Sequence, residues 1–339
     1  MNNFNLLLDK ILSHEHLSQP DMSSMMEAIM TGQLSDMQIA AFMIALRMKG
    51  ESIDEIASAA EVMRKFSNKV AIDSSTHLID TCGTGGDSLQ TFNVSTLSSI
   101  IAASAGAIVA KHGGRSVSSK CGSADVLESL GVNVNLGFEN LSKLVNKIGI
   151  GFMFAPNYHP AMKYVAPVRK GLGVRTIFNM LGPLTNPAGA QRQVIGVFSK
   201  DLCMVFAEVL QKLGSKHVLV VHGEDGMDEI SITGKTTVAE LKDNQISQYE
   251  ISPNDFGFKN GSMTDITVEN VEESKQKILA ILDGERGSAR DISVLNAGAA
   301  IYVSGLAGSI EKGLHLAEKL IDSGEARHKL EELIVNSHV

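Results

Sequence analysis

The chain has 339 residues, of which 44% are hydrophobic and 20% are charged, and its formal net charge is -8. The length predicts about two domains, and the composition is typical of a globular protein with ample apolar material for a large core. The acidic balance and the lack of a Lys/Arg run argue against nonspecific nucleic-acid binding, which needs a basic surface. They do not exclude a local basic pocket for a small anionic substrate.

The cysteines, the N-terminal residues and the longest uncharged run bear on the cell compartment. Cys82, Cys121 and Cys203 are widely spaced, odd in number and form no C-x-x-C pair, which favours a reducing compartment over a disulfide framework or a Cys-rich zinc site. The first residues lack the order of a signal peptide. Residues 92–110 are uncharged but contain several polar side chains, so we expect a buried helix followed by a buried strand instead of a membrane span. We therefore expect a cytoplasmic protein that binds neither membrane nor nucleic acid.

Residues 1 to about 68 predict helices only. Ser35 and Ser52 each precede a Gln or Glu by three positions, which is the spacing of a capping box that satisfies free backbone amides. Residues 37–48 are apolar nearly all round, which predicts a helix that is deeply buried or packed in an interface. Gly50 follows as a C-terminal stop.

From about residue 76, short apolar runs alternate with helical stretches. Strands are expected at residues 77–80, 107–110, 151–155, 193–198 and 217–222. Helices are expected between them, at residues 95–105, 124–130, 139–148 and 202–213. Residues 234–251 are strand-like, and residues 270–284, 290–305 and 310–335 are helical. This alternation predicts α/β units on a largely parallel sheet.

The stretch G-T-G-G-D-S-L-Q-T-F-N-V-S-T, residues 83–96, joins the first expected strand to a helix. Ligands of open α/β sheets lie at the carboxyl ends of strands, and helix N-termini present free amides to anions. The glycines allow close backbone approach, although neither a P-loop nor G-x-G-x-x-G is present. Asp87 is unexpected in a phosphate site, because two like charges about 4 Å apart cost roughly 4 kcal/mol at an effective dielectric near 20. A tight turn with a serine cap is the alternative interpretation.

Three further segments offer charged side chains. Residues 111–125, K-H-G-G-R-S-V-S-S-K-C-G-S-A-D, follow an expected strand and carry cations and hydroxyls that suit a phosphorylated ligand. In residues 223–231, G-E-D-G-M-D-E-I-S, Asp228 and Glu229 would suit Mg²⁺ beside such a site, because Mg²⁺ bridges carboxylates and substrate phosphates. In residues 158–187, Arg169 and Arg175 could fix a carboxylate. Ordinary solvated surface is the alternative for all three.

Together these four segments resemble the anthranilate phosphoribosyltransferase family, whose architecture is shared with pyrimidine nucleoside phosphorylases. The motifs G-T-G-G-D, T-F-N-V-S-T, K-H-G-x-R-S-V-S-S-K-x-G-S-A-D, H-P-A-M, V-R-K-x-L-G-x-R-T, N-x-L-G-P-L-T-N-P and G-x-D-E occur in family order and span nearly the whole chain. The resemblance implies a small N-terminal helical domain at residues 1–70, with a returning segment near 165–185. It implies a large α/β domain with a mostly parallel central sheet at residues 71–339, and a homodimer joined through helical-domain surfaces.

The resemblance further implies transfer of the phosphoribosyl group of phosphoribosyl pyrophosphate (PRPP) to the amine of anthranilate, with release of pyrophosphate, in tryptophan biosynthesis. Mg²⁺ is the implied cofactor, held by Ser95, Asp228 and Glu229. The residues implied to line the PRPP site are Gly83, Gly86, Asp87, Thr91, Asn93, Val94, Ser95, Thr96, Lys111, Ser118, Ser119 and Ser123. The residues implied to face anthranilate are Gly83, His112, Gly114, His159 and Arg169, with the rest of the loop at 111–115.

This chemistry needs positioning more than proton transfer. Pyrophosphate is a polyanion, so Mg²⁺, Lys111 and loop amides can stabilise its developing charge. The aromatic amine is already a competent nucleophile, so the protein mainly positions the reactants and we expect no catalytic triad or general base. Asp87 is expected to accept hydrogen bonds from ribose hydroxyls or from metal-bound water.

Gly114 departs from the family pattern, which usually has Asn after K-H-G. Without that amide, water or a neighbour substitutes, acceptor affinity is weaker, or a different amine is used. Ser88 stands where Gly is common, which we expect to be tolerated. Two other functions therefore stay open: a related phosphoribosyl or ribosyl transferase with another acceptor, and a non-enzymatic paralogue that binds nucleic acid.

Overall fold

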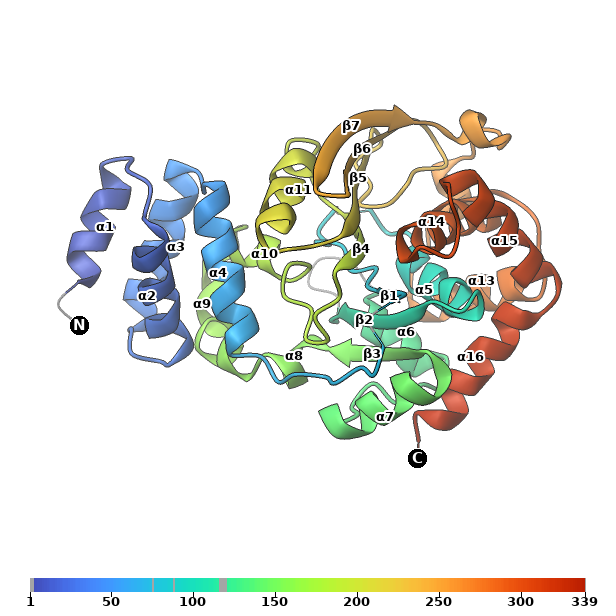
Figure 1. Cartoon of the computed structure of the whole chain (residues 1–339), viewed down its shortest axis with the longest axis horizontal. Helices are drawn as coiled ribbons and strands as arrows, with labels where there is room; N and C mark the ends of the chain where they lie inside the picture. Colours follow the sequence, from blue (N-terminus) through green and yellow to red (C-terminus); the bar gives the residue numbers. More distant parts are fainter. Residues whose placement is uncertain (1–2, 75, 88, 116–120, 339) are drawn as a thin grey trace.

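The computed structural model describes residues 3–74, 76–87, 89–115 and 121–338 of the chain. A small bundle of helices lies beside a larger α/β body, as expected from the sequence, and the C-terminus lies in that body (Figure 1). Over the described residues, no helix has the length and apolar character that crossing a membrane requires.

The bundle consists of α1 (Phe4–Leu12), α2 (Gln19–Met30), α3 (Asp36–Lys49) and α4 (Ile53–Lys65). Both expected capping boxes are confirmed. The hydroxyls of Ser35 and Ser52 accept hydrogen bonds from the backbone N–H groups of Gln38 at 3.4 Å and Glu55 at 3.2 Å. Gly50 ends α3 with a φ of 87°, a conformation that favours glycine, so the predicted stop is also confirmed.

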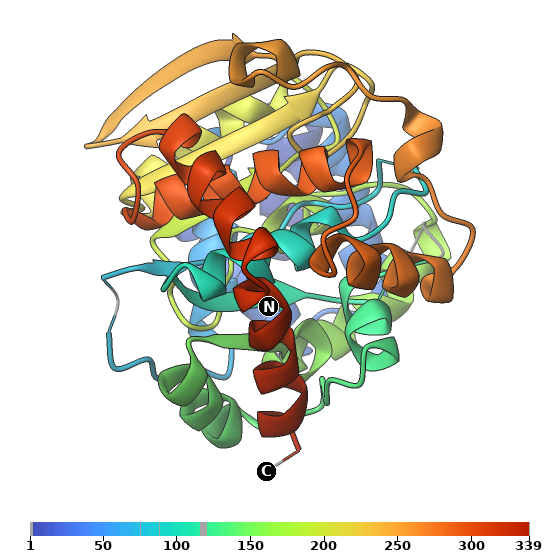
Figure 2. The ribbon, with the colours of Figure 1, turned by 90° about the vertical axis from the view of Figure 1, so that its right-hand side faces the viewer.

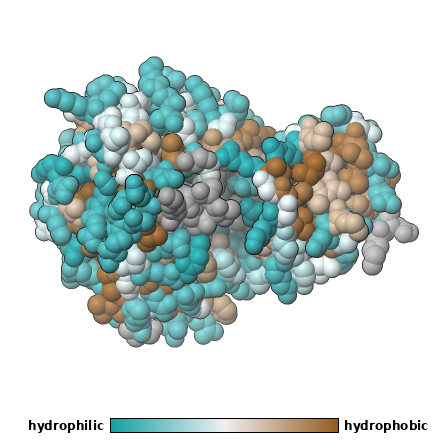
Figure 3. Space-filling model, turned by 180° about the vertical axis from the view of Figure 1, so that it is seen from behind, coloured by the Kyte–Doolittle hydropathy of each residue, from teal (hydrophilic) through white to brown (hydrophobic). Residues whose placement is uncertain are grey.

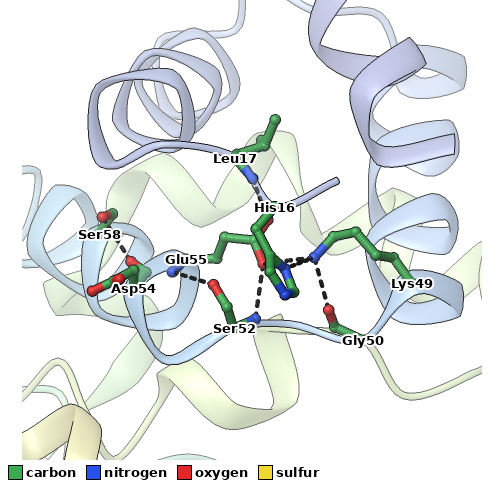
Figure 4. Close-up of polar contacts among 8 residues, drawn as sticks. All are labelled: His16, Leu17, Lys49, Gly50, Ser52, Asp54, Glu55 and Ser58. Carbon is green, nitrogen blue, oxygen red and sulfur yellow. Dashed lines mark hydrogen bonds and ion pairs between the residues drawn. The ribbon is translucent and has the colours of Figure 1, made fainter. Parts of the chain in front are cut away.

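A buried ion pair joins the chain before α2 to the ends of α3 and α4 (Figure 4). The fully buried Glu55 carboxylate accepts hydrogen bonds at 2.8 Å from the backbone N–H groups of Leu17 and Ser52 and from the Lys49 ammonium. Burial acts to raise the pKa of Glu55, but the hydrogen bonds from Lys49, Ser52 and Leu17 hold it below its ordinary value. The Lys49 ammonium also lies 2.7 Å from His16 Nδ1. Losing one partner would leave a buried unpaired charge, so this pair holds the α3–α4 corner together.

A later segment returns to the bundle. It contains α8 (Ala155–Tyr158), the 3-10 helix η1 (Pro160–Tyr164), α9 (Ala166–Leu172) and α10 (Phe178–Leu181). Val168 and Phe178 belong to the same hydrophobic cluster as Phe42 and Leu46 of α3. This cluster extends to Phe206 of α11 (Leu202–Lys212), which packs against the sheet. A continuous apolar core therefore joins the bundle to the α/β body.

The strands form two sheets that meet at one bridge. The first sheet is parallel, with the order β1 (Leu78–Ile79), β2 (Ile108–Gly113) and β3 (Ile150–Phe154). The second has the order β4 (Arg192–Gly196), β5 (His217–Gly223), β6 (Thr236–Lys242) and β7 (Gln245–Ile251), and its first pair is parallel while the others are antiparallel. Asp80 pairs with Gln193 in a parallel bridge, so the β1 edge continues into β4. The parallel strands thus bring their carboxyl ends to one edge.

The antiparallel hairpin carries a satisfied polar network. Glu240 of β6 accepts hydrogen bonds from the hydroxyls of Tyr249 and Tyr302, both at 2.8 Å, and lies 2.9 Å from His217 Nε2. Burial acts to raise the pKa of Glu240, but the contacts with His217, Tyr302 and Tyr249 lower it to about 2. Because His217 belongs to β5 and Tyr302 to α14 (Ser288–Ser304), this network fixes the hairpin against both elements.

Helices cover the sheet on the side opposite the bundle. Figure 2 shows the C-terminal helices in front of the strands and the bundle behind them. The remaining elements are α5 (Val94–Ser104), α6 (Ser123–Ser129), α7 (Phe138–Ile148), η2 (Pro253–Phe256), α12 (Met263–Ile266), α13 (Val271–Leu282), α14 (Ser288–Ser304), α15 (Ile310–Asp322) and α16 (Glu325–Asn336). The predicted helical stretch 310–335 is divided at Gly324, whose φ of 79° interrupts it.

The expectation of deep burial for residues 37–48 is wrong for the two methionines at the ends of this range. Met37 and Met48 are 81% and 79% exposed, because α3 buries only the face that packs in the bundle. Hydrophobic residues gather on the surface over the bundle, at the right of Figure 3. The alternative, an interface on this surface, stays a prediction.

Candidate active site

A polar cavity lies where β1, β4 and β5 end and α5 begins. It is lined by Thr81, Gly83, Ser95, Ser98, Val194, Gly196, Asp228, Glu229 and Asn296. These residues come from the loop after β1, from α5, from β4, from the acidic loop after β5 and from α14. The carboxyl edge of the sheet therefore brings the predicted glycine loop and acidic loop together.

Two glycines allow the acidic loop to approach closely. A Cβ atom on Gly196 would lie 1.4 Å from the Asp228 carbonyl oxygen, and one on Gly83 would lie 3.0 Å from an Asp228 carboxylate oxygen. Gly83, expected beside PRPP and anthranilate, thus lies against a carboxylate in the cavity. Gly196 leaves the space that the Asp228 backbone occupies.

Asp228 and Glu229 accept hydrogen bonds from backbone amides of the loop that they face. The Gly85 N–H donates to Asp228 Oδ2 at 2.8 Å, and the Ser95 N–H in the first turn of α5 donates to Glu229 Oε1 at 3.1 Å. Burial raises the pKa of both carboxyls, and the charge of Asp228 raises that of Glu229 further. Both acids therefore lie at amides that would also suit a phosphate.

Asp87 adds a third carboxyl to this group. Burial, and then the neighbouring Asp228, raise the pKa of Asp87, whose Oδ1 accepts a hydrogen bond from the Leu89 N–H at 3.1 Å. Gly86 has a φ of 78°, and its carbonyl accepts a hydrogen bond from Arg175. Arg175 thus contacts the glycine loop, while the predicted ribose or water partner of Asp87 stays a prediction.

Lys111 is a buried cation at this group. Its ammonium donates to the Thr81 carbonyl at 2.8 Å and to the hydroxyls of Thr81 and Ser95 at 3.2 Å each. Burial raises the pKa of Asp228 and Glu229, and the charge of Lys111 opposes that rise. Lys111 is a residue of β2, and its ammonium lies between the end of β1 and the start of α5, where it can face a polyanion.

The donor set fits Mg²⁺. Ser95, Asp228 and Glu229 offer oxygen atoms, which are the ligands that Mg²⁺ prefers. The carboxyls of Asp87 and Glu229 both lie close to Asp228, the charge of Lys111 opposes the rise in pKa of Asp228 and Glu229, and a divalent cation would help to balance the negative charge of the group. Among the described residues, no three His, Cys, Asp or Glu side chains are grouped to hold a metal unaided. Mg²⁺ commonly completes its shell with water and substrate phosphates.

His112 and His159 form a buried pair at the end of β2. Their ring centroids are 5.0 Å apart, and His112 Nδ1 lies 3.2 Å from the Gly182 carbonyl oxygen. Burial and then His159 lower the pKa of His112 to about 3, and burial and then Lys69 lower the pKa of His159 to about 4, so both rings are neutral at pH 7. Neither Nε2 atom has a hydrogen-bond partner among the described residues. Because buried polar atoms are normally satisfied, the pair suits a polar ligand or an ordered water.

The other residues predicted near anthranilate are more dispersed. Arg169 of α9 is half-buried, burial lowers its pKa, and its guanidinium has no hydrogen bond or ion pair within the described part of the chain. A Cβ atom on Gly114 would meet no atom of the described residues within 4 Å, so they leave room for a side chain at this position. Arg115 instead turns toward α6, where it pairs with Asp125 at 2.7 Å and Glu128 at 2.6 Å.

Asn93 links the glycine loop, residues 83–96, to the segment that begins at Lys111. Its side-chain amide donates to the Cys121 carbonyl at 3.0 Å, and its Oδ1 accepts from the Thr96 hydroxyl at 3.5 Å. Thr91 forms an antiparallel bridge with Thr267, outside the residues that line the cavity. The amide of Asn93 is therefore engaged by the protein itself.

The remaining predicted PRPP residues lie at two helix starts or outside the description. Val94 and Ser123 are the first residues of α5 and α6. Ser118 and Ser119 lie outside the described residues.

The sequence analysis did not single out Asp80 and Asn186, which lie under the site. The fully buried Asp80 carboxyl accepts hydrogen bonds from the His112 N–H at 3.0 Å and from the Asn186 side chain at 2.7 Å. Asn186 also donates to the Ala110 carbonyl at 2.9 Å. Burial raises the pKa of Asp80 to about 6, although Lys111 opposes the rise. The sequence feature that could have identified Asp80 is its place, since an acidic residue there ends an expected buried strand and directly precedes a glycine loop.

Thr81, Ser98 and Asn296 line the cavity and were also missed. The Ser98 hydroxyl is buried and has no hydrogen-bond partner among the described residues. Ser98 and Asn296 lie inside helices, where a polar side chain carries no local signal of function.

Family models match both parts of the chain. Residues 75–327 match the glycosyl transferase family, a/b domain, and residues 6–67 match the glycosyl transferase family, helical bundle domain. The anthranilate phosphoribosyltransferase of Methylobacillus flagellatus is 55% identical over 97% of this chain and 96% of its own length.

Solved structures agree with these matches. Anthranilate phosphoribosyltransferase from Thermus thermophilus is 39% identical, with a TM-score of 0.93 over 98% of this chain and 99% of that one. The Saccharomyces cerevisiae enzyme in complex with PRPP and Mg is 27% identical, with a TM-score of 0.90 over 99% of this chain and 98% of that one. The same yeast protein is also known in complex with 4-fluoroanthranilate. The chain therefore belongs to the glycosyl transferase family and, within it, to the anthranilate phosphoribosyltransferases.

Proposed function

We propose that the protein transfers the phosphoribosyl group of PRPP to the amine of anthranilate, giving N-(5-phosphoribosyl)anthranilate and pyrophosphate, and that this reaction takes place at the polar cavity. The observation that carries this assignment is the meeting of the Gly83–Gly86 loop, the first turn of α5, Lys111 and the Asp228–Glu229 pair at one edge of the sheet. It rests on this geometry together with the family to which the chain belongs.

The protein's own groups stabilise the leaving pyrophosphate. The Lys111 ammonium offers positive charge to an anion that gains charge as the glycosidic bond breaks. The N–H groups of Gly85 and Ser95, which donate to Asp228 and Glu229 in this structure, would donate to that anion if the two carboxylates turned to the metal. Asp87 is assigned to the ribose hydroxyls or to metal-bound water. As the bond to pyrophosphate breaks, the ribosyl carbon becomes electron-poor and the aromatic amine attacks it, and the released pyrophosphate can take the proton that the amine loses. The residues therefore position the two reactants, and no general base is assigned.

Mg²⁺ is assigned to Ser95, Asp228 and Glu229. When bound, it neutralises the pyrophosphate charge in a site that already holds three carboxyls. The chain's contribution is to present these oxygens on one short segment and at the start of α5.

The acceptor is assigned to the end of β2, next to the buried pair of His112 and His159. Both imidazoles are neutral, and their Nε2 atoms have no hydrogen-bond partner in the part of the chain that the structure describes, so they can hydrogen-bond an uncharged amine. The Arg169 guanidinium, which has no hydrogen bond or ion pair to the described residues, suits the carboxylate of anthranilate, because arginine binds carboxylates with two parallel hydrogen bonds. Gly114 leaves open space in this loop.

The assay follows anthranilate fluorescence. Purified protein mixed with anthranilate, PRPP and Mg²⁺ should extinguish the fluorescence, and removal of Mg²⁺ with EDTA should prevent this. Asp228→Asn combined with Glu229→Gln should greatly lower Mg²⁺-supported turnover. Unchanged fluorescence with an active control enzyme would refute the activity, and near-normal turnover of the double variant would refute the metal assignment.

A second acceptor is favoured by one observation, the open space at Gly114. A related aromatic amine with a larger substituent would fill it. A screen of amines at fixed PRPP decides between the two, and normal efficiency with anthranilate alone would remove this candidate.

The helical bundle is assigned as a homodimer interface. Leu6, Leu12, Met37 and Met48 are 55%, 62%, 81% and 79% exposed on α1 and α3. Light scattering should give a dimer, and Met37→Lys with Met48→Lys should shift it toward monomer. Val335→Lys, on the 67% exposed Val335 of α16, is the matched control and should not. A wild-type monomer at micromolar concentration would refute the interface.

The remaining assignments complete the proposal. The domains are residues 1–70 with the returning segment near 165–185, and residues 71–339. The protein acts in the cytoplasm and binds neither nucleic acid nor membrane. A salt-dependent shift of DNA at micromolar protein would contradict this and favour the nucleic-acid-binding alternative.

A further inference from the structure

Asp228 and Glu229 lie on a loop that has no regular secondary structure to fix its backbone. No helix or strand includes Asp228 or Glu229, which lie between β5 and β6. We propose that Asn296 and Asp225 are positioning residues that fix the two sides of this loop, so that both carboxyl groups face the glycine loop and α5. This inference rests on the proposed role of the pair in binding Mg²⁺.

Asn296 holds the backbone directly after the pair. It lies in α14 and is 2% exposed. Its Oδ1 accepts a hydrogen bond from the Ile230 N–H at 2.9 Å, and its Nδ2 donates to the Ile230 carbonyl at 2.9 Å. The Nδ2 also donates to the Ile292 carbonyl at 2.9 Å, which fixes the side chain on its own helix. The residue after Glu229 is thereby tied to a rigid helix through both of its peptide groups.

Asp225 holds the loop before the pair. Its Oδ1 accepts a hydrogen bond from the Met227 N–H at 3.0 Å. Its Oδ2 accepts from the hydroxyls of Ser231 at 2.5 Å and Thr233 at 2.6 Å. One carboxylate therefore joins residues on both sides of Asp228, and it closes the loop across its base.

This arrangement is important because metal ligands must keep nearly fixed positions. A functional group needs to lie within about 0.5 Å of its productive position, and a loop closed by three hydrogen bonds to one carboxylate has little freedom. Asn296 also lines the cavity beside Asp228 and Glu229, so its clamp acts at the site itself. Residues that orient metal ligands in this way commonly change metal affinity by about 10- to 100-fold when replaced.

Three variants test the proposal with opposite changes of charge. Asn296→Asp adds a negative charge and removes the donor to Ile230, Asp225→Asn removes a negative charge, and Ser231→Ala with Thr233→Val changes none. A charge effect alone would tighten Mg²⁺ binding in the first and weaken it in the second. Loss of positioning should instead weaken Mg²⁺ binding in all three variants. Asp265→Asn is the control, because the exposed Asp265 of α12 accepts a hydrogen bond from the Ser288 hydroxyl at 2.8 Å and does not line the cavity.

The measurements are the half-saturating Mg²⁺ concentration at saturating PRPP and anthranilate, and the rise in thermal midpoint that Mg²⁺ with PRPP produces. We expect half-saturation to rise about tenfold or more in each variant, kcat at saturating Mg²⁺ to stay within about threefold, and the thermal rise to shrink. High Mg²⁺ should thus rescue the variants, which a merely misfolded site would not allow. If half-saturation is unchanged, or if kcat falls without it, the proposal is overturned.

The double variant Asp228→Asn with Glu229→Gln separates this proposal from the proposed function. If that variant keeps the wild-type Mg²⁺ dependence, the metal assignment itself fails. If it loses Mg²⁺ dependence while the positioning variants keep the wild-type value, only the positioning role of Asn296 and Asp225 fails.

Discussion

Replacing Gly196 with alanine should disrupt the active site more than the fold. The added Cβ would lie 1.4 Å from the Asp228 carbonyl oxygen, whereas nonbonded carbon and oxygen atoms need about 3.3 Å. The Asp228 backbone must therefore move by about 2 Å. A misplacement of about 1 Å at a reacting centre can cost roughly 100-fold in rate. We expect kcat/KM to fall at least about 100-fold, which corresponds to about 2.7 kcal/mol of transition-state stabilisation.

The assay compares Gly196→Ala with Gly308→Ala, whose Cβ would meet no atom within 4 Å. Initial rates of anthranilate fluorescence loss give kcat/KM, and thermal melts give stability. Overpacking should destabilise Gly196→Ala by about 1–3 kcal/mol, so the protein stays folded while its activity falls. If Gly196→Ala keeps wild-type kcat/KM and Mg²⁺ dependence, the acidic loop is not held where we place it, and the reasoning fails.

Three further predictions concern other parts of the molecule. Gly114→Asn should fold with an unchanged thermal midpoint, because its Cβ has open space, and should lower KM for anthranilate; a large loss of stability would contradict this. Glu55→Gln should cost about 3–5 kcal/mol in urea unfolding, because it leaves the buried Lys49 charge unpaired, whereas Glu27→Gln in the exposed pair with Lys65 should cost less than about 1 kcal/mol. Glu240 has a pKa of about 2 when folded and 4.5 as its ordinary value, so its stabilisation is complete above pH 4.5 and is lost as pH falls toward 2. The stability difference between wild type and Glu240→Gln, at most roughly 3 kcal/mol, should shrink over that window, and a difference that does not vary with pH would refute the assignment.

Local patterns in the sequence predicted most of the fold. The capping boxes at Ser35 and Ser52 formed as expected, because a cap depends on residues three positions apart. The uncharged run at 92–110 became α5 and the start of β2, as its polar side chains indicated. The loops after β1, β2 and β5 were placed at strand ends, and the rule that parallel strands share a carboxyl edge brought them together.

Contacts between distant segments were not predictable in this way. Nothing in the sequence around Gly196 indicates that the backbone of Asp228, on a different loop, lies against it. Asp80 and Asn186 meet only because β1, β2 and the segment before β4 converge. The exposure of Met37 depends on what covers α3, and composition does not state which face of an apolar helix has a neighbour.

The structure of the cavity explains why the glycine loop carries a carboxylate. Asp87 is one of three half-buried acids. Burial raises the pKa of all three, and the charge of Asp228 raises the pKa of Asp87 and Glu229 further. Two of them accept hydrogen bonds from the Gly85 and Ser95 amides that a phosphate would use. A polyanion alone would meet like charges costing roughly 4 kcal/mol per close pair, and a cation alone would lack oxygen ligands to complete its shell. The site therefore favours the two together, so that the acids that repel phosphate become the groups that attract metal-bound phosphate.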